Sequence, residues 1–148
     1  MPFHFRLHAI LHFRKSIEHQ QELRLRAANQ QVARMRHLIE QVEARRQELA
    51  AARGRELSAG VTAAELRFGL QCDAELVRHK KDLQQQLQRF QQLRDQQREL
   101  FQQARKDRET LEGIHDQQLH LFEQEAARRQ QRSQDDLFLL RREYLRRG

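Results

Sequence analysis

At 148 residues the chain is long enough for one domain, but 33% charged residues, no tryptophan and one tyrosine are not the composition of a compact globule. Lysine and arginine number 28 against 21 aspartate and glutamate, a formal charge of +7. That charge suits nucleic acid, an anionic membrane or an acidic protein surface without selecting one of them. The single cysteine excludes an intrachain disulfide and fits a reducing cytosol, and no apolar run reaches the ~20 residues that span a bilayer.

The remaining composition predicts long helices. The one proline is Pro2, so no later residue forbids helix, and no segment shows the alternation of period two that strands require. Abundant Ala, Glu, Leu, Arg and Gln with periodic apolar residues is typical of a coiled coil. The N-terminus lacks the continuous apolar core of a secretory signal. We therefore predict an all-α protein in which residues 1–148 form a single coiled-coil domain, soluble and cytoplasmic.

The first predicted helix covers about residues 3–57 and carries a heptad seam. From Ala28 to Leu49 the apolar residues recur in alternating steps of four and three, which is the spacing of a coiled coil. Two consecutive steps of four through Gln21 predict a local unwinding of the supercoil without a break in the helix.

The turn at residues 58–62, Ser-Ala-Gly-Val-Thr, is the one clear interruption of the helical pattern. Gly60 can take the left-handed conformation that ends a helix without a Cβ penalty. Thr62 and Glu65 form a T-x-x-E capping box, which starts the next helix. Folding about this turn gives two long helices in an antiparallel coiled-coil hairpin.

The second predicted helix, about residues 62–147, is longer than the first and should overhang it. At about 1.5 Å per residue the helices extend about 80 Å and about 130 Å, which places Phe3 near Asp116. We expect a bend near Gly113, because glycine inside a helix costs about 1 kcal/mol relative to alanine. Apolar residues continue in the overhang as far as Leu145, which implies another protein, self-association as a homodimer, or a fold-back.

Signals for catalysis are missing. The chain has no glycine-rich phosphate loop, no G-x-S-x-G, no H-E-x-x-H and no cysteine pair, so we expect neither an enzyme nor a cofactor. His4, His8 and His12 share one helical face at a spacing that can bind a metal. No carboxylate or cysteine completes the set, and we predict no metal site.

A basic cluster lies at the end of the chain. Elsewhere acidic residues are interspersed with the arginines, as on the solvated faces of long helices. The cluster combines a Leu/Phe stripe with positive charge and suits an acidic protein ring better than a membrane surface or nucleic acid. Its members are Arg141, Arg142, Tyr144, Arg146 and Arg147.

The chain resembles the FliJ family, soluble stalk and chaperone components of the flagellar type III protein export apparatus. The resemblance rests on the size and basic charge, the F-x-x-L-type opening, the Ser-Ala-Gly-Val-Thr turn at residues 58–62, and the charged stretch ending in Leu-Glu at residues 105–112. It implies a two-helix coiled coil like that of the rotary-ATPase gamma subunit. It further implies that the open end enters the hexameric export ATPase, that the end near the turn contacts the membrane export gate protein, and that export chaperones are handled. The location implied is the cytoplasm, peripherally at the inner face of the cell membrane.

The resemblance also suggests site residues. For the gate contact the positions that fit are Val42, Leu49 and Leu76, which keep an apolar side chain where the family presents one. Packing between the two helices explains these apolar side chains equally well. For the ATPase ring the expected contacts are the basic cluster of residues 141–147. Two other functions stay open: a structural coiled-coil spacer or adaptor, and a nucleic-acid-binding basic hairpin. A flagellar and an injectisome system are not distinguished.

Overall fold

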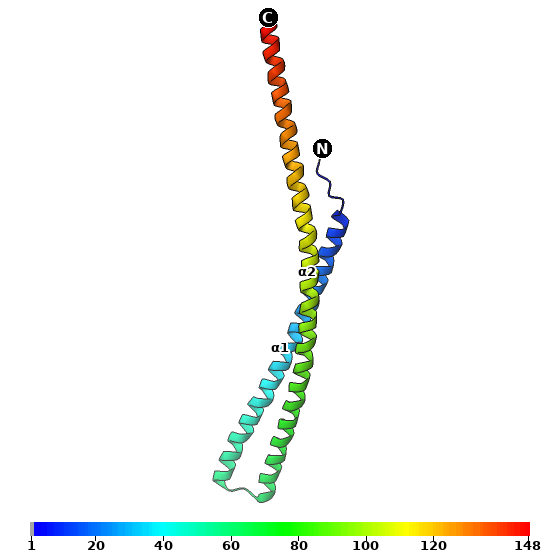
Figure 1. Cartoon of the computed structure of the whole chain (residues 1–148). Helices are drawn as coiled ribbons and strands as arrows, with labels where there is room; N and C mark the ends of the chain where they lie inside the picture. Colours follow the sequence, from blue (N-terminus) through cyan, green and yellow to red (C-terminus); the bar gives the residue numbers. More distant parts are fainter. Residues whose placement is uncertain (1) are drawn as a thin grey trace. The chain divides into compact units, whose positions relative to one another are not determined.

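The computed structural model describes residues 2–148, which form two helices and, within that range, no strand: α1 (His8–Ala59) and α2 (Ala63–Arg147), joined by a loop of residues 60–62 (Figure 1). The predicted all-α helical hairpin is therefore confirmed. α1 begins at His8, whereas the sequence pattern placed its start near residue 3. The chain divides into two compact units, residues 19–102 and residues 2–18 with 103–148, which are taken in turn.

The turn has the chemistry that its sequence predicts. Gly60 follows the last residue of α1 and has a φ of 93°, in the left-handed region that favours glycine. The Thr62 side-chain oxygen accepts a hydrogen bond from the backbone N–H of Glu65 at 3.2 Å, so Thr62 caps α2. The Ser58 hydroxyl donates to the carbonyl of Gly54 at 3.0 Å in the last turn of α1. The start of α2 is thus capped by a residue of the turn itself.

Alanine substitutions at two glycines of this region should change stability in opposite directions. Gly60→Ala should lower the free energy of unfolding by about 1 kcal/mol, because alanine is strained at a positive φ. Gly54→Ala should raise it by about 0.5–1 kcal/mol, because Gly54 is helical and open space surrounds the site of the added Cβ. Urea denaturation followed by circular dichroism measures the change in the free energy of unfolding for each variant. Changes of the same sign would contradict the positive φ assigned to Gly60.

The unit of residues 19–102 is held together by an apolar seam between antiparallel helices. Met35, Val42 and Leu83 are buried, with the partly buried residues of the same cluster packed on them: Leu38, Ile39, Leu76, Leu87 and Phe90. Met35 and Val42 are seven residues apart, as are Leu76, Leu83 and Phe90, which is the predicted heptad spacing. Where Gln21 enters the seam, its side-chain oxygen accepts a hydrogen bond from the side-chain amide of Gln97. This polar pair satisfies two glutamines inside the seam.

The second unit packs the start of the chain on the middle of α2. Phe5, Leu11 and Ala104 are its buried residues. Edge-on aromatic contacts join Phe3 and Phe5 to His115, with ring centroids 5.5 Å and 5.0 Å apart. Phe3 therefore lies beside the residue next to Asp116, as the register predicts. These contacts hold residues 3–5 outside the helix, which is why α1 begins late.

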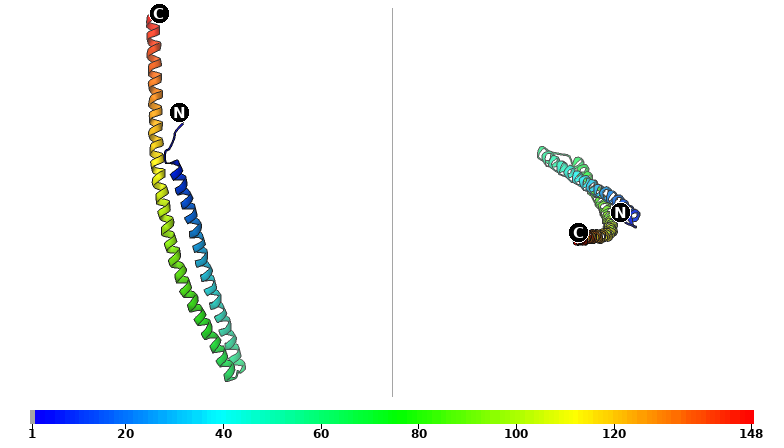
Figure 2. Two further views of the ribbon diagram at one scale, coloured as in Figure 1. Left: turned by 90° about the vertical axis from the view of Figure 1, so that its right-hand side faces the viewer. Right: turned by 90° about the horizontal axis from the view of Figure 1, so that it is seen from above.

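Beyond this aromatic contact α2 continues alone within its unit (Figures 1 and 2). Phe3 also meets Phe122, at 5.5 Å between ring centroids, and every residue from 123 onwards is exposed. We call residues 123–147 the tail. α2 runs through Gly113 without interruption, and a bend there stays a prediction.

Candidate partner-binding surfaces

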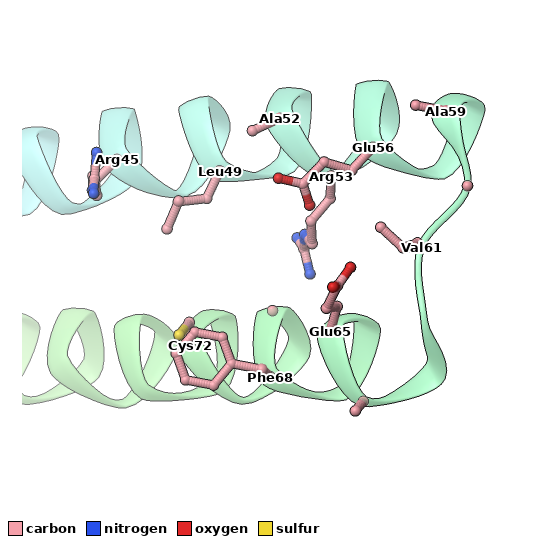
Figure 3. A pocket seen from close by; sticks show the side chains of 13 residues that line it. Arg45, Leu49, Ala52, Arg53, Glu56, Ala59, Val61, Glu65, Phe68 and Cys72 are labelled. Atoms are coloured by element: carbon pink, nitrogen blue, oxygen red, sulfur yellow. The ribbon is translucent and has the colours of Figure 1, made fainter.

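The turn is flanked by a hollow of about 960 Å³ between the last turns of α1 and the first turns of α2. Leu49, Arg53 and Val61 point into the space between the helices, as does Glu65 (Figure 3). Phe68 lines it with 69% of its surface exposed, an unusual exposure for a phenylalanine. The complete lining consists of Arg45, Leu49, Ala52, Arg53, Glu56, Ala59, Gly60, Val61, Ala64, Glu65, Phe68, Gly69 and Cys72.

Small residues contribute to the lining of the hollow from both helices and the loop: Ala52, Ala59, Gly60, Ala64 and Gly69. No residue of this lining is buried, in contrast to Leu83 farther along the seam. Gly69 also makes room for Arg53: a Cβ at Gly69 would lie 3.1 Å from the Arg53 Cδ. The Arg53 guanidinium passes over this glycine to within 3.9 Å of the Asp73 carboxylate. The floor of the hollow is therefore an arginine stem rather than a packed apolar layer.

Ion pairs join the two helices next to the hollow, on its side away from the turn. Arg46 donates to Asp73 at 3.2 Å, and Lys80 donates to Glu43 at 2.8 Å. The hydrogen bond from Lys80 lowers the pKa of Glu43, and the hydrogen bond to Asp73 raises the pKa of Arg46. Asp73 is the common partner of Arg46 and Arg53, a pairing that depends on the rotation of α2 about its axis and that the sequence pattern does not show.

The three residues suggested for a gate contact occupy different environments. Val42 is only 8% exposed and belongs to the buried cluster, and Leu76 packs against that cluster. Leu49 is partly exposed and lines the hollow. The structure thus gives Val42 and Leu76 a packing role, while Leu49 lines the hollow together with the exposed Phe68. A partner contact by any of the three stays a prediction.

The tail presents the basic cluster together with apolar side chains. Within the described chain, Arg141, Arg142, Arg146 and Arg147 make no ion pair, and Tyr144 is 80% exposed. Leu137, Phe138, Leu139, Leu140 and Leu145 are each more than half exposed. So many large apolar groups on one unpaired helix segment mark an interaction surface.

One cluster in the second unit was not anticipated from the sequence. Arg108 donates to both oxygens of Glu18, from Nη2 at 3.1 Å and from Nε, and to Glu112 at 2.6 Å. Lys15 lies 3.5 Å from Glu112, and Arg14 donates to Asp107 at 3.4 Å. The hydrogen bonds to the two carboxylates raise the pKa of Arg108, and the Arg108 bond lowers the pKa of Glu112. These pairs fix the register of the unit beside its aromatic contacts.

No three histidine, cysteine or acidic side chains within residues 2–148 gather closely enough to hold a metal ion. Neither helix, over the same residues, has a stretch long and apolar enough to cross a membrane. Cys72 is a free thiol at the rim of the hollow.

Comparison with known proteins gives one family. The family model described as "Flagellar FliJ protein" matches residues 3–148, essentially the whole chain. No curated protein and no solved structure matches the chain.

Proposed function

Because the chain belongs to the FliJ family and is thus a flagellar export component, we propose that it acts as a stalk of the hexameric export ATPase and links that ATPase to the membrane export gate. In this role the tail enters the central hole of the ring. The protein itself catalyses no reaction; it transmits contact between two machines. It works in the cytoplasm, peripherally at the inner face of the cell membrane.

The observation that carries the ring contact is the tail. It is a helix segment exposed on every side, with four arginines free of ion pairs in the described chain and apolar groups between them. A narrow segment of this kind fits a hole lined by several subunits, and its charge suits acidic loops. The residues proposed to bind the ring are Arg141, Arg142, Tyr144, Arg146 and Arg147.

The observation that supports the gate contact is the hollow at the turn. Apolar Leu49 and Phe68 line it, and a partner side chain could occupy its volume of about 960 Å³. Aromatic groups in such hollows are typical centres of binding. We therefore place Leu49 in the contact and propose Phe68 beside it, with Val42 and Leu76 supporting them from the seam.

Charge reversal of the tail tests the stalk function. The quadruple variant R141E/R142E/R146E/R147E should weaken stimulation of the export ATPase from the same cell by at least about tenfold, because four favourable pairs become repulsive. Helicity by circular dichroism should stay within the range of the wild type, since these side chains make no contacts that hold the fold. ATPase rate is measured against protein concentration.

A matched control separates a specific contact from loss of positive charge. The variant R24E/R34E/R36E/R98E changes the net charge equally at four exposed arginines, none of which makes an ion pair in the described chain. It should stimulate as the wild type does. Equal stimulation by both quadruple variants would remove the tail from the ring contact, and a wild type without any effect on a competent ATPase would leave a structural coiled coil as the function.

A further inference from the structure

One side of the tail near its end is apolar. A helix turns by about 100° per residue, which gathers five large side chains of residues 137–147 within an arc of about 160°. Four of the five line a single hollow on the surface of α2, and each of the five is between 62% and 80% exposed. Of the large apolar residues in this range, Leu139 lies on the opposite side of the helix. We call the five the apolar arc: Leu137, Phe138, Leu140, Tyr144 and Leu145.

Positive charge borders the apolar arc on both sides. Arg142 lies about 40° beyond Phe138 at one edge, and Arg147 lies about 20° beyond Leu140 at the other. Within the described chain neither arginine makes an ion pair, and Glu143 lies outside the arc. An apolar arc with cations at both edges is typical of a helix that lies in the surface of an anionic membrane. Its apolar side enters the boundary between headgroups and acyl chains, and its cations meet the lipid phosphates.

Arg141 favours lipid over a groove in a folded protein as the occupant of this surface. It lies inside the arc, between Leu137 and Leu145 around the helix, and lines the same hollow. In a protein groove its guanidinium would be buried and would require a carboxylate at that one point. At a bilayer surface its aliphatic stem lies among the apolar groups, and the guanidinium reaches up to phosphates that are present all along the surface.

We propose that the apolar arc binds an anionic lipid bilayer, with the end of the tail lying along the membrane surface. This binding goes beyond the proposed ring contact and does not depend on it. It is reversible, since five side chains enter only as far as the headgroup boundary, and each arginine close to the surface strengthens it by about fivefold. A tail inside the ring is not available to lipid. If the stalk function holds, the ring and the membrane therefore compete for the tail.

The fluorescence of Tyr144 tests the binding directly, because Tyr144 is the only tyrosine in a chain without tryptophan. The full-length protein is mixed at physiological salt with vesicles of phosphatidylcholine and phosphatidylglycerol in equal parts, or of phosphatidylcholine alone. The anionic vesicles should reduce quenching of Tyr144 by acrylamide at least about threefold, since the ring moves from water into the headgroup boundary. Phosphatidylcholine alone should leave the quenching unchanged. Anionic vesicles that leave Tyr144 as accessible as in water would overturn the proposal.

Leu137→Gln and Leu139→Gln form a matched pair. The two leucines are 62% and 54% exposed and two residues apart, but only Leu137 belongs to the arc. Glutamine keeps the helix propensity of this segment, and neither change alters the charge. Leu137→Gln should weaken co-sedimentation with the anionic vesicles about fivefold, and Leu139→Gln less than about twofold. Equal effects at the two positions would show adsorption through charge alone and exclude insertion of the arc.

A second pair of variants tests the arginines at the edges of the arc. Arg142→Gln/Arg147→Gln should weaken co-sedimentation with the anionic vesicles about twentyfold, because both lost charges lie at the lipid surface. Arg24→Gln/Arg34→Gln removes the same net charge at two exposed arginines of α1 and should weaken it less than about threefold. Equal losses would mean that the positive charge of the whole chain, and not the tail, adsorbs to the vesicles.

Lipid binding and ATPase stimulation are measured separately, so the two proposals can fail separately. Stimulation of the ATPase without binding to anionic vesicles would keep the stalk function and exclude lipid. Vesicle binding without stimulation would do the reverse. If vesicles are not bound and Leu137→Gln loses stimulation, the arc belongs to the ring contact. Binding to duplex DNA in place of vesicles would assign the arginines to nucleic acid.

Discussion

Replacing Leu83 with alanine is expected to lower the free energy of unfolding of the residue 19–102 unit by about 2–3 kcal/mol. Leu83 is 6% exposed and is the one buried residue that α2 contributes to the cluster with Met35 and Val42. Its loss removes apolar area and leaves a cavity that two helices can only partly close, which places the cost at the lower end of leucine-to-alanine changes. Urea denaturation followed by circular dichroism measures it.

Leu93 provides the matched control on the same helix and in the same unit. It is 55% exposed, so Leu93→Ala should change the free energy of unfolding by no more than about 0.5 kcal/mol. Equal costs at the two positions would mean that the helices do not pack through Leu83. The result also bears on Val42, because Val42 belongs to the same buried cluster. For a Val42 variant that loses gate binding, the free energy of unfolding therefore has to be measured as well.

Replacing Arg108 with alanine should have the second largest effect, about 2 kcal/mol. The change removes hydrogen bonds to Glu18 and Glu112 and leaves a Glu18 side chain, 18% exposed, without its cation. Arg105→Ala is the control, because Arg105 is 58% exposed and pairs only with Glu109 one turn away. It should cost no more than about 0.5 kcal/mol.

The cost of losing Arg108 should depend on pH in a defined direction. Arg108 lowers the pKa of Glu112 in the folded chain, so this carboxylate stabilises the fold above its unfolded value of 4.5. The stabilisation is lost as pH falls through the lowered pKa. The difference between wild type and Arg108→Ala should therefore be full at pH 7 and should shrink near pH 3. A constant difference over this range would exclude the carboxylate pairing as its cause.

The hairpin could be predicted from the sequence because its turn depends on local chemistry. Gly60 and Thr62 act on their immediate backbone neighbours, and the structure gives both the predicted conformation and the predicted hydrogen bond. Heptad spacing likewise predicts which residues face inward, and Val42 and Leu83 do so. Periodicity and capping together are sufficient for a fold made of two helices.

Interactions between the helices could not be predicted in the same way. The shared use of Asp73 by Arg46 and Arg53, and the cluster around Arg108, require the axial rotation of each helix to within a fraction of a turn. The late start of α1 has the same origin, since Phe3 and Phe5 leave the helical pattern to contact His115 of α2. Local propensity is overridden there by tertiary packing.

The candidate surfaces were predictable in part. Exposure of the basic tail followed from the unequal lengths of the helices. The hollow did not, because its lining residues come from the end of α1 and the start of α2, and they come together only in the folded hairpin. An exposed Phe68 inside a helical pattern was the available signal.

The continuity of α2 has a consequence for how the tail becomes ordered. A helix of this length cut from the chain must form its first turn unaided, and that nucleation step is unfavourable by a factor of about a thousand. In the intact chain, residues 103–122 already supply a formed turn, so the tail needs only propagation. Ion pairs one turn apart in the tail, such as Glu125 with Arg129 at 2.7 Å, then stabilise the helix as it extends. A partner therefore meets a segment that is already largely helical, and the entropy lost on binding is smaller than that of a disordered peptide with the same sequence.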